Sequence, residues 1–233
     1  MMKTNINDIK IVYEDNHLLV VVKPENILSQ ADETDDLDML TLLKAYLKDK
    51  YNKPGNVFLG LVQRLDQRVS GLMVFAKTSK AASRLANDIR DRKLEKIYYA
   101  IITGDIAESG QLENYIKKVK VDGKSRAIIK SRPSKVAKYA KLRYKKIKSI
   151  MLDGEIFSLV EVKLITGRYN QIRAQFAHIN KPLINDFKYG YRLKNYNDHL
   201  GLACVGLAFE HPVTKEKLSF THIPDFGIWL KFR

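Results

Sequence analysis

The chain has little cysteine and no long apolar run, and each scarcity excludes a class of protein. Cys204 is the only cysteine among 233 residues, so neither an intrachain disulfide nor a zinc site built on several cysteines can form. The five histidines lack the spacing of a metal-binding helix, and we expect no metal. Because no run of 18 apolar residues occurs and residues 1–10 lack an apolar signal core, we expect a cytoplasmic protein.

Acidic residues are few beside the basic ones. Lysine and arginine together number 41 against 26 aspartates and glutamates, which gives a formal net charge of +15. Such an excess favours a polyanionic partner, because each neutralised phosphate releases counterions. The positive charge is concentrated in residues 117–148, which contain fourteen basic residues and one acid, Asp122. The alternative interpretation is that these basic residues form an ordinary solvated face and bind no polyanion.

The hydrophobic pattern predicts an α+β fold built from consecutive hairpins rather than from alternating βαβ units. Hydrophobic residues make up 45% of the chain, enough for a packed interior. We expect an acidic loop over 25–38 and hairpin turns at Asp122-Gly123 and Asp153-Gly154. Helices are expected over 39–51, over 79–92 with Ser79 as the N-cap, and over 170–179. Strands are expected over 9–13, 17–22, 57–61, 72–77, 96–103, 115–130 (as a hairpin), 138–150, 156–165, 200–209 and 218–221.

One polar loop carries the residues best suited to chemistry. Within Gln63–Leu72, Asp66 stands between Arg64 and Arg68, on a loop between two expected strands. Nearby guanidinium charge keeps a carboxylate ionised, as a nucleophilic carboxylate must be. A structural Arg–Asp pair that fixes a turn is the alternative interpretation.

The same segment resembles the HRLDxxTSGL motif of the RluA family of RNA pseudouridine synthases. Further segments resemble other motifs of that family in the same order. They are Val22–Pro24 (KP), Lys96–Ala100 followed by Gly104 (K-x-Y-x-A…G), Leu164–Arg173 (L-x-TGRTHQIR), Pro182–Gly190 (PLxGDxxYG) and Leu207–Pro212 (LxFxHP). Five positions depart from the family pattern, namely Gln63 for His, Val69 for Thr, Tyr169 for Thr, Asn170 for His and Asn185 for Gly.

The resemblance implies a fold and an activity. It implies the α+β pseudouridine synthase fold, with a largely antiparallel mixed sheet flanked by helices and loops and an active-site cleft across the sheet. We expect a single catalytic domain over 1–233, without the N-terminal RNA-binding domain of many relatives, and a monomer. The implied reaction is the site-specific isomerisation of uridine to pseudouridine in structured RNA, ribosomal or transfer, without a cofactor.

The resemblance also assigns roles to residues. Asp66, Tyr98 and Arg173 are the implied catalytic residues, and Asp66 attacks either C1′ of the ribose or the uracil ring. The Tyr98 ring would stack on the flipped base or assist proton transfer, while Tyr99 faces the other side of its strand. Arg173 is the expected ion-pair partner of Asp66, and Arg168 is the alternative partner or a phosphate ligand. RNA-binding residues are expected to be Arg64, Arg68, Arg168, Gln171, Lys138, Lys141, Arg143 and Lys145. The basic side chains of 117–148, the last four of these included, are expected to project outward along one side of their strands as a stripe.

Two other functions stay open at the level of sequence. A catalytically inactive RNA-binding protein would keep the scaffold, although binding alone needs no carboxylate facing a polyanion. A carbohydrate or nucleoside hydrolase would use Asp66 together with a second carboxylate, and no second acid accompanies Asp66 in these motifs.

Overall fold

A computed structural model describes residues 6, 9–34, 36–191, 193 and 199–233. Asp35, expected in the acidic loop, lies outside the described residues. The chain divides into two compact units, Met1–Lys96 with Cys204–Ile223 and Ile97–Ala203 with Pro224–Arg233. The single catalytic domain over 1–233 stays a prediction.

The first unit is built on a set of hydrogen-bonded strands whose middle strand is fully buried. The strand order is β1 (Lys10–Glu14), β2 (Leu18–Lys23), β4 (Ser70–Ala76) and β10 (Leu202–Glu210), with β3 (Gly60–Leu61) also paired to β4 and β11 (Lys217–Thr221) to β10. Every residue of β4 is buried. A strand buried on both faces reads as a continuous apolar run, which explains the Leu72–Ala76 sequence.

Both helices of this unit begin at side-chain caps. In α1 (Met39–Lys50) the carboxylate of Asp38 accepts a hydrogen bond from the backbone nitrogen of Thr41 at 3.0 Å, as the acidic loop predicts. In α2 (Ser79–Arg90) the cap is Thr78, whose hydroxyl accepts from the backbone nitrogen of Ala81 at 3.2 Å. The prediction of Ser79 as the cap is therefore wrong by one residue, because Thr78 already has the extended backbone that a cap requires.

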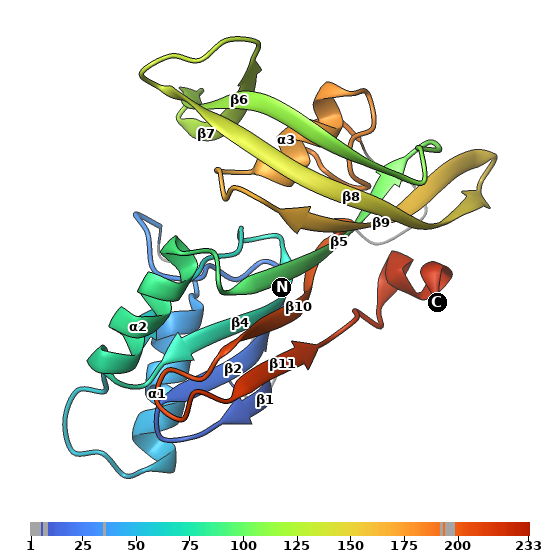
Figure 1. Ribbon diagram of the computed structural model, residues 1–233. Coiled ribbons are helices and arrows are strands. Elements are labelled where there is room, and N and C mark those ends of the chain that lie inside the picture. The colour runs from blue at the N-terminus through green and yellow to red at the C-terminus, as the bar shows by residue number, and fades with distance from the viewer. Residues whose placement is uncertain (1–5, 7–8, 35, 192, 194–198) are drawn as a thin grey trace. The chain divides into compact units, whose positions relative to one another are not determined.

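The second unit holds a series of antiparallel strands together with helix α3 and a 3₁₀ helix (Figure 1). The strand order is β5 (Glu95–Thr103), β9 (Glu155–Leu164), β8 (Ala137–Leu152), β6 (Ser109–Val121) and β7 (Lys124–Lys130). Helix α3 (Gln171–His178) covers one face, where Ala174 packs with Ile116, Ala127 and Ala140. A 3₁₀ helix over Gly227–Phe232, which the hydrophobic pattern does not predict, buries Ile228 and Trp229.

Both predicted hairpin turns are confirmed. Asp122 and Gly123 have φ of 47° and 74°, and Asp153 and Gly154 have φ of 48° and 81°. Two successive positive φ values match the right-handed twist of the flanking strands, and Asp-Gly tolerates them at low cost.

Two strand boundaries differ from the prediction by more than two residues. The strand expected over 57–61 is only Gly60–Leu61, and β6 starts at Ser109 rather than at residue 115. Residues 109–114 pair with 140–145 of β8, a long-range partner that a local hydrophobic pattern does not contain.

Glu14 joins the end of β1 to α1 and to Lys77, the residue that follows β4. Its two oxygens accept four hydrogen bonds of 2.7 to 2.9 Å, from Tyr46, Lys50, Tyr51 and Lys77. Burial raises the pKa of this carboxyl group, but the four donors outweigh burial and lower the pKa to about 2.

Glu14→Gln is expected to reduce the free energy of unfolding by roughly 1–3 kcal/mol near pH 7, since two lysines lose their buried partner. A lowered folded-state pKa contributes stability that is fully present above pH 4.5 and is lost as the pH falls toward 2. Urea unfolding of both proteins between pH 2 and 7 checks this. A difference between them that does not shrink below pH 4.5 contradicts the assignment.

Candidate active site

Asp66 lies half-buried on the loop that connects β3 to β4. The backbone nitrogen of Val69 donates to the Asp66 carbonyl at 3.0 Å, which closes a turn directly after the carboxylate. Arg64 is exposed and Arg68 is half-buried, so the two arginines of the motif have different surroundings. Gln63 is buried, and its side-chain amide donates to the Leu72 carbonyl at 3.3 Å. The loop is thus tied to β4 from within.

Gly71 explains why a glycine follows the loop. Its φ is +119°, and a Cβ atom there would overlap the backbone nitrogen and carbonyl of Cys204 on the neighbouring strand. No L side chain fits both the dihedral angle and the close strand approach.

Lys23 is a fully buried cation beneath the loop, and the sequence interpretation gave it no role beyond its motif. Its Nζ donates to the carbonyls of Pro24 at 2.7 Å, Ile27 at 2.7 Å and Gln67 at 2.9 Å. Burial lowers the pKa of Lys23 to about 7, while the negative charges of Glu25 and Asp66 oppose that shift. The three carbonyl acceptors match the three donors of an ammonium group and favour the charged form.

Tyr98 and Tyr99 are consecutive on β5 and therefore face opposite sides of the sheet. Tyr98 pairs with Val162 and is 7% exposed, whereas Tyr99 pairs with Glu161 and is half-buried. Burial and the Glu161 charge raise the pKa of Tyr99. The expected contrast between the two faces is present, and the contact of Tyr98 with a base stays a prediction.

Arg173 forms a buried bidentate ion pair with Asp186. Its Nε and one terminal nitrogen each lie 2.7 Å from an oxygen of the Asp186 carboxylate, and the two side chains are 5% and 0% exposed. The backbone nitrogens of Lys188 and Tyr189 also donate to Asp186, at 3.2 and 3.3 Å. Asp186 thus fixes the guanidinium plane of Arg173.

Asp66 belongs to the first unit and Arg173 to the second. The pairing of Arg173 with Asp66 stays a prediction. Asp186 was not among the expected site residues. Its signal in the sequence is an acid one residue beyond the apolar segment Pro182–Ile184, after Asn185, since a buried acid requires a cation or several donors.

Gln171 and Arg168 organise the loop before α3. The Gln171 side-chain oxygen accepts from the Thr166 hydroxyl and from the Arg168 backbone nitrogen, both at 2.9 Å. Arg168 Nε donates to the Tyr139 carbonyl at 2.8 Å. These bonds hold the loop against β8, and the expected contacts of both residues with RNA stay predictions.

Two departures from the family pattern have a backbone explanation. Asn170 and Asn185 have φ of 47° and 57°, in the left-handed region where asparagine is among the better tolerated residues after glycine. Asn185 occupies the position of a family glycine, and asparagine satisfies the same requirement. Its side chain also donates to the His199 carbonyl and accepts from the Leu193 nitrogen, at 3.0 and 2.9 Å.

The four basic residues expected on β8 do not share one face. The face of β8 opposite α3 carries Lys141, Arg143 and Lys145 at alternate positions. Lys138 is paired across the strands with Ile116 and lies on the α3 face. The prediction of one stripe containing all four is therefore wrong, because Lys138 has the opposite strand parity. Lys141 also pairs with Glu113 of β6 at 2.6 Å, so part of its charge is neutralised.

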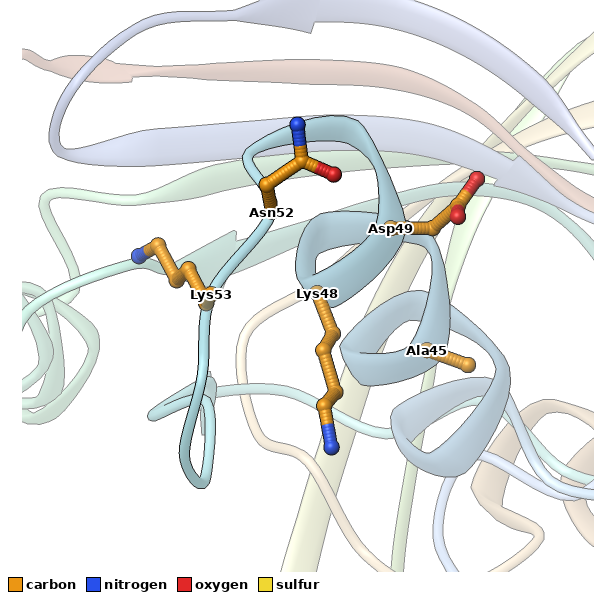
Figure 2. Close-up of a pocket in the computed structure, with 5 residues that line it drawn as sticks. All are labelled: Ala45, Lys48, Asp49, Asn52 and Lys53. Atoms are coloured by element: carbon orange, nitrogen blue, oxygen red, sulfur yellow. The ribbon is translucent and has the colours of Figure 1, made fainter.

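A shallow hollow of about 460 Å³ lies at the C-terminal end of α1 (Figure 2). It is lined by Ala45, Lys48, Asp49, Asn52 and Lys53. None of these residues belongs to the motifs, and none offers the aromatic wall on which a base stacks. We assign no part of the reaction to this hollow.

Comparison with known proteins covers most of the chain. A family model described as RNA pseudouridylate synthase matches residues 17–178. Ribosomal large subunit pseudouridine synthase D from Pseudomonas aeruginosa is 33% identical over 238 residues, which cover 96% of this chain and 71% of that protein. tRNA pseudouridine synthase C from Vibrio parahaemolyticus is 30% identical over 225 residues, which cover 91% of this chain and 88% of that protein.

A solved structure supports the fold. Human RNA pseudouridylate synthase domain containing 4 matches with a TM-score of 0.73 at 23% identity, covering 91% of this chain and 87% of that chain. This likeness confirms the expected α+β pseudouridine synthase fold.

Proposed function

The chain belongs to the RNA pseudouridylate synthase family, the RluA family, and on that basis we propose that Asp66 is the carboxylate on which its isomerisation of uridine to pseudouridine in RNA depends. One observation carries the proposal. Asp66 is partly accessible on a loop whose neighbouring residue, Gln67, is held by the buried Lys23 through its carbonyl at 2.9 Å. A carboxylate that is both accessible and fixed meets the requirement for covalent catalysis.

The chemistry requires three events at the target nucleotide. The bond between C1′ and N1 breaks, the uracil rotates, and a bond between C1′ and C5 forms while C5 loses its proton. An attack by Asp66 on C1′ or on the uracil ring would divide this exchange into easier steps. Tyr98 would support the flipped base and Arg173 would fix the carboxylate, with Asp186 holding the Arg173 plane.

We propose that the substrate is structured ribosomal or transfer RNA. The similar proteins are named for both kinds of RNA, at 33% and 30% identity, so the names favour neither. The test is to incubate the purified protein with unmodified ribosomal RNA and with unmodified transfer RNA and then to map pseudouridine. The RNA that gains pseudouridine is the substrate. Release of free uracil without pseudouridine would instead support a hydrolase, and binding without either product would support the inactive alternative.

In the second unit, the strand face opposite α3 is the proposed site for the RNA backbone. This outer basic face includes Lys117, Lys124, Lys130, Lys141, Arg143, Lys145 and Lys163. Two acids lie on the same face, Glu113 opposite Lys141 and Glu161 opposite Lys145. Arg143 and Lys163 are directly opposite each other on neighbouring strands, and both are exposed. Like charges directly opposite each other on neighbouring strands repel and destabilise the free protein. A polyanion bound across them would reduce this repulsion.

Replacing Arg143, Lys145 and Lys163 by glutamine is expected to weaken RNA affinity about 3- to 10-fold. For single-stranded segments each lost phosphate contact reduces the slope of log affinity against log salt by about 0.7, so three contacts reduce it by about 2. Filter binding over a range of salt concentrations measures both. The single-turnover rate at saturating RNA should change less than about twofold, since these contacts position the backbone without reading the base.

A triple variant of the first unit provides the matched control. Lys48, Lys53 and Lys93 are exposed, and their replacement by glutamine removes the same net charge. If both triple variants lower the salt slope equally, the effect is one of net charge and the outer basic face is not the binding site.

A further inference from the structure

Ser29 lies in the segment between β2 and α1, at a place fixed by the start of the helix. The preceding residue, Leu28, forms a β-bridge with Asp38, the N-cap of α1. Its nitrogen donates to the Leu37 carbonyl at 3.1 Å, and its carbonyl accepts from the Met39 nitrogen at 2.8 Å. The backbone on which Ser29 stands is therefore anchored to a regular element.

The Ser29 hydroxyl satisfies both backbone groups of Leu65, the residue before Asp66. Its Oγ donates to the Leu65 carbonyl at 2.8 Å and accepts from the Leu65 nitrogen at 3.0 Å. Ser29 is 5% exposed and Leu65 is 7% exposed, so water is poorly placed to replace the hydroxyl. Buried backbone groups without partners are costly, and this side chain satisfies two of them at once.

The residue after Asp66 is tied to the same segment. Lys23 Nζ bridges the carbonyl of Ile27 at 2.7 Å and the carbonyl of Gln67 at 2.9 Å. Residues 27–29 and 65–67 are therefore joined by two buried side chains, one on each side of Asp66. Two anchors that flank one residue restrict the direction in which its side chain leaves the backbone.

We propose that Ser29 is a positioning residue for the Asp66 carboxylate. It acts through Leu65, and its role rests on the proposed function of Asp66. Misplacement of a reacting group by about 1 Å costs on the order of 10²-fold in rate, whereas RNA affinity depends on contacts elsewhere. Loss of the hydroxyl should therefore reduce the chemical step without reducing binding.

Ser29→Ala is expected to lower the single-turnover rate at saturating RNA about 10- to 100-fold, with the dissociation constant for RNA unchanged within about twofold. Ser29→Thr keeps the hydroxyl and should restore the rate to within about threefold of the parent. The Met73 sulfur lies 3.9 Å from Oγ, and a flexible methionine beside this site adapts readily to an added methyl group.

Thr78→Ala is the control for lost stability. It removes the cap of α2 in the same unit and should lower the melting temperature, but it touches neither the loop nor Ser29. All rates are measured well below the melting temperature of the least stable variant. Equal rate losses in Ser29→Ala and Thr78→Ala, or no recovery in a folded Ser29→Thr, overturn the proposal.

Asp66→Asn in the same assay distinguishes the two levels of failure. If Asp66→Asn stays active, the proposed function of Asp66 is wrong whatever Ser29→Ala does. If Asp66→Asn is inactive while Ser29→Ala matches the parent, only the positioning role of Ser29 is wrong.

Discussion

Asp66→Asn is expected to reduce turnover by roughly 10³-fold or more while leaving RNA binding within about twofold. An amide has nearly the shape of a carboxylate but cannot serve as an anionic nucleophile. The Leu65 and Gln67 anchors bind backbone atoms, so the substitution leaves them in place. Release of tritium from RNA that carries 5-tritiated uridine measures turnover, because the hydrogen at C5 leaves when the new bond forms.

Asp91→Asn is the matched control for that experiment. Asp91 is an exposed carboxylate at the C-terminal end of α2 in the same unit, outside all of the motifs. It should behave like the parent protein in both rate and affinity. Retention of more than about 5% of parental turnover by Asp66→Asn would remove Asp66 from the catalytic role, because lost nucleophiles cost far more than that.

The elements that could be predicted from the sequence are those with a local cause. The Asp-Gly turns, the acidic start of α1 and the buried run of β4 each depend on residues close together in the chain. Long-range pairing has no such signal. The early start of β6 and the Glu113 partner of Lys141 exist only because β8 lies alongside.

In the candidate site, too, the features with a local cause could be predicted and the long-range contacts could not. The motif around Asp66 could be recognised from the sequence, and so could the lysine at position 23. What Lys23 does could not, because its acceptors are backbone carbonyls and any residue supplies a carbonyl. Ser29 is harder still, since a lone serine in a loop has no pattern and its partner lies 36 residues away.

Lys138 shows the limit of counting charges along a sequence. Fourteen basic residues in 117–148 predict a positive surface correctly in sign, because most of them are exposed. The count does not say which strand face each one occupies. Lys138 lies on the opposite face from Arg143 because the two are five positions apart, an odd offset, in an unbroken register.

Arg173→Ala is expected to lose both stability and activity, and the buried pair with Asp186 explains the first loss. Removing one partner of a buried bidentate pair leaves an uncompensated charge, at a cost of about 3–5 kcal/mol. Arg168→Lys should cost much less, because Arg168 donates one exposed hydrogen bond to a carbonyl. Activity measured on Arg173→Ala alone therefore does not separate a role in the reaction from a role in folding.

The double variant Arg173→Ala/Asp186→Asn separates them. Neutralising Asp186 removes the stranded charge, so the double variant should be more stable than Arg173→Ala by roughly 1–3 kcal/mol, measured by urea unfolding. If Arg173 fixes the carboxylate of Asp66, the rate should stay at least about 100-fold below the parent despite the regained stability. Asp186→Asn alone keeps the Arg173 guanidinium, so it should retain more activity than Arg173→Ala or the double variant. Recovery of rate in parallel with stability would instead assign Arg173 to folding alone and leave the partner of Asp66 to be sought at Arg168.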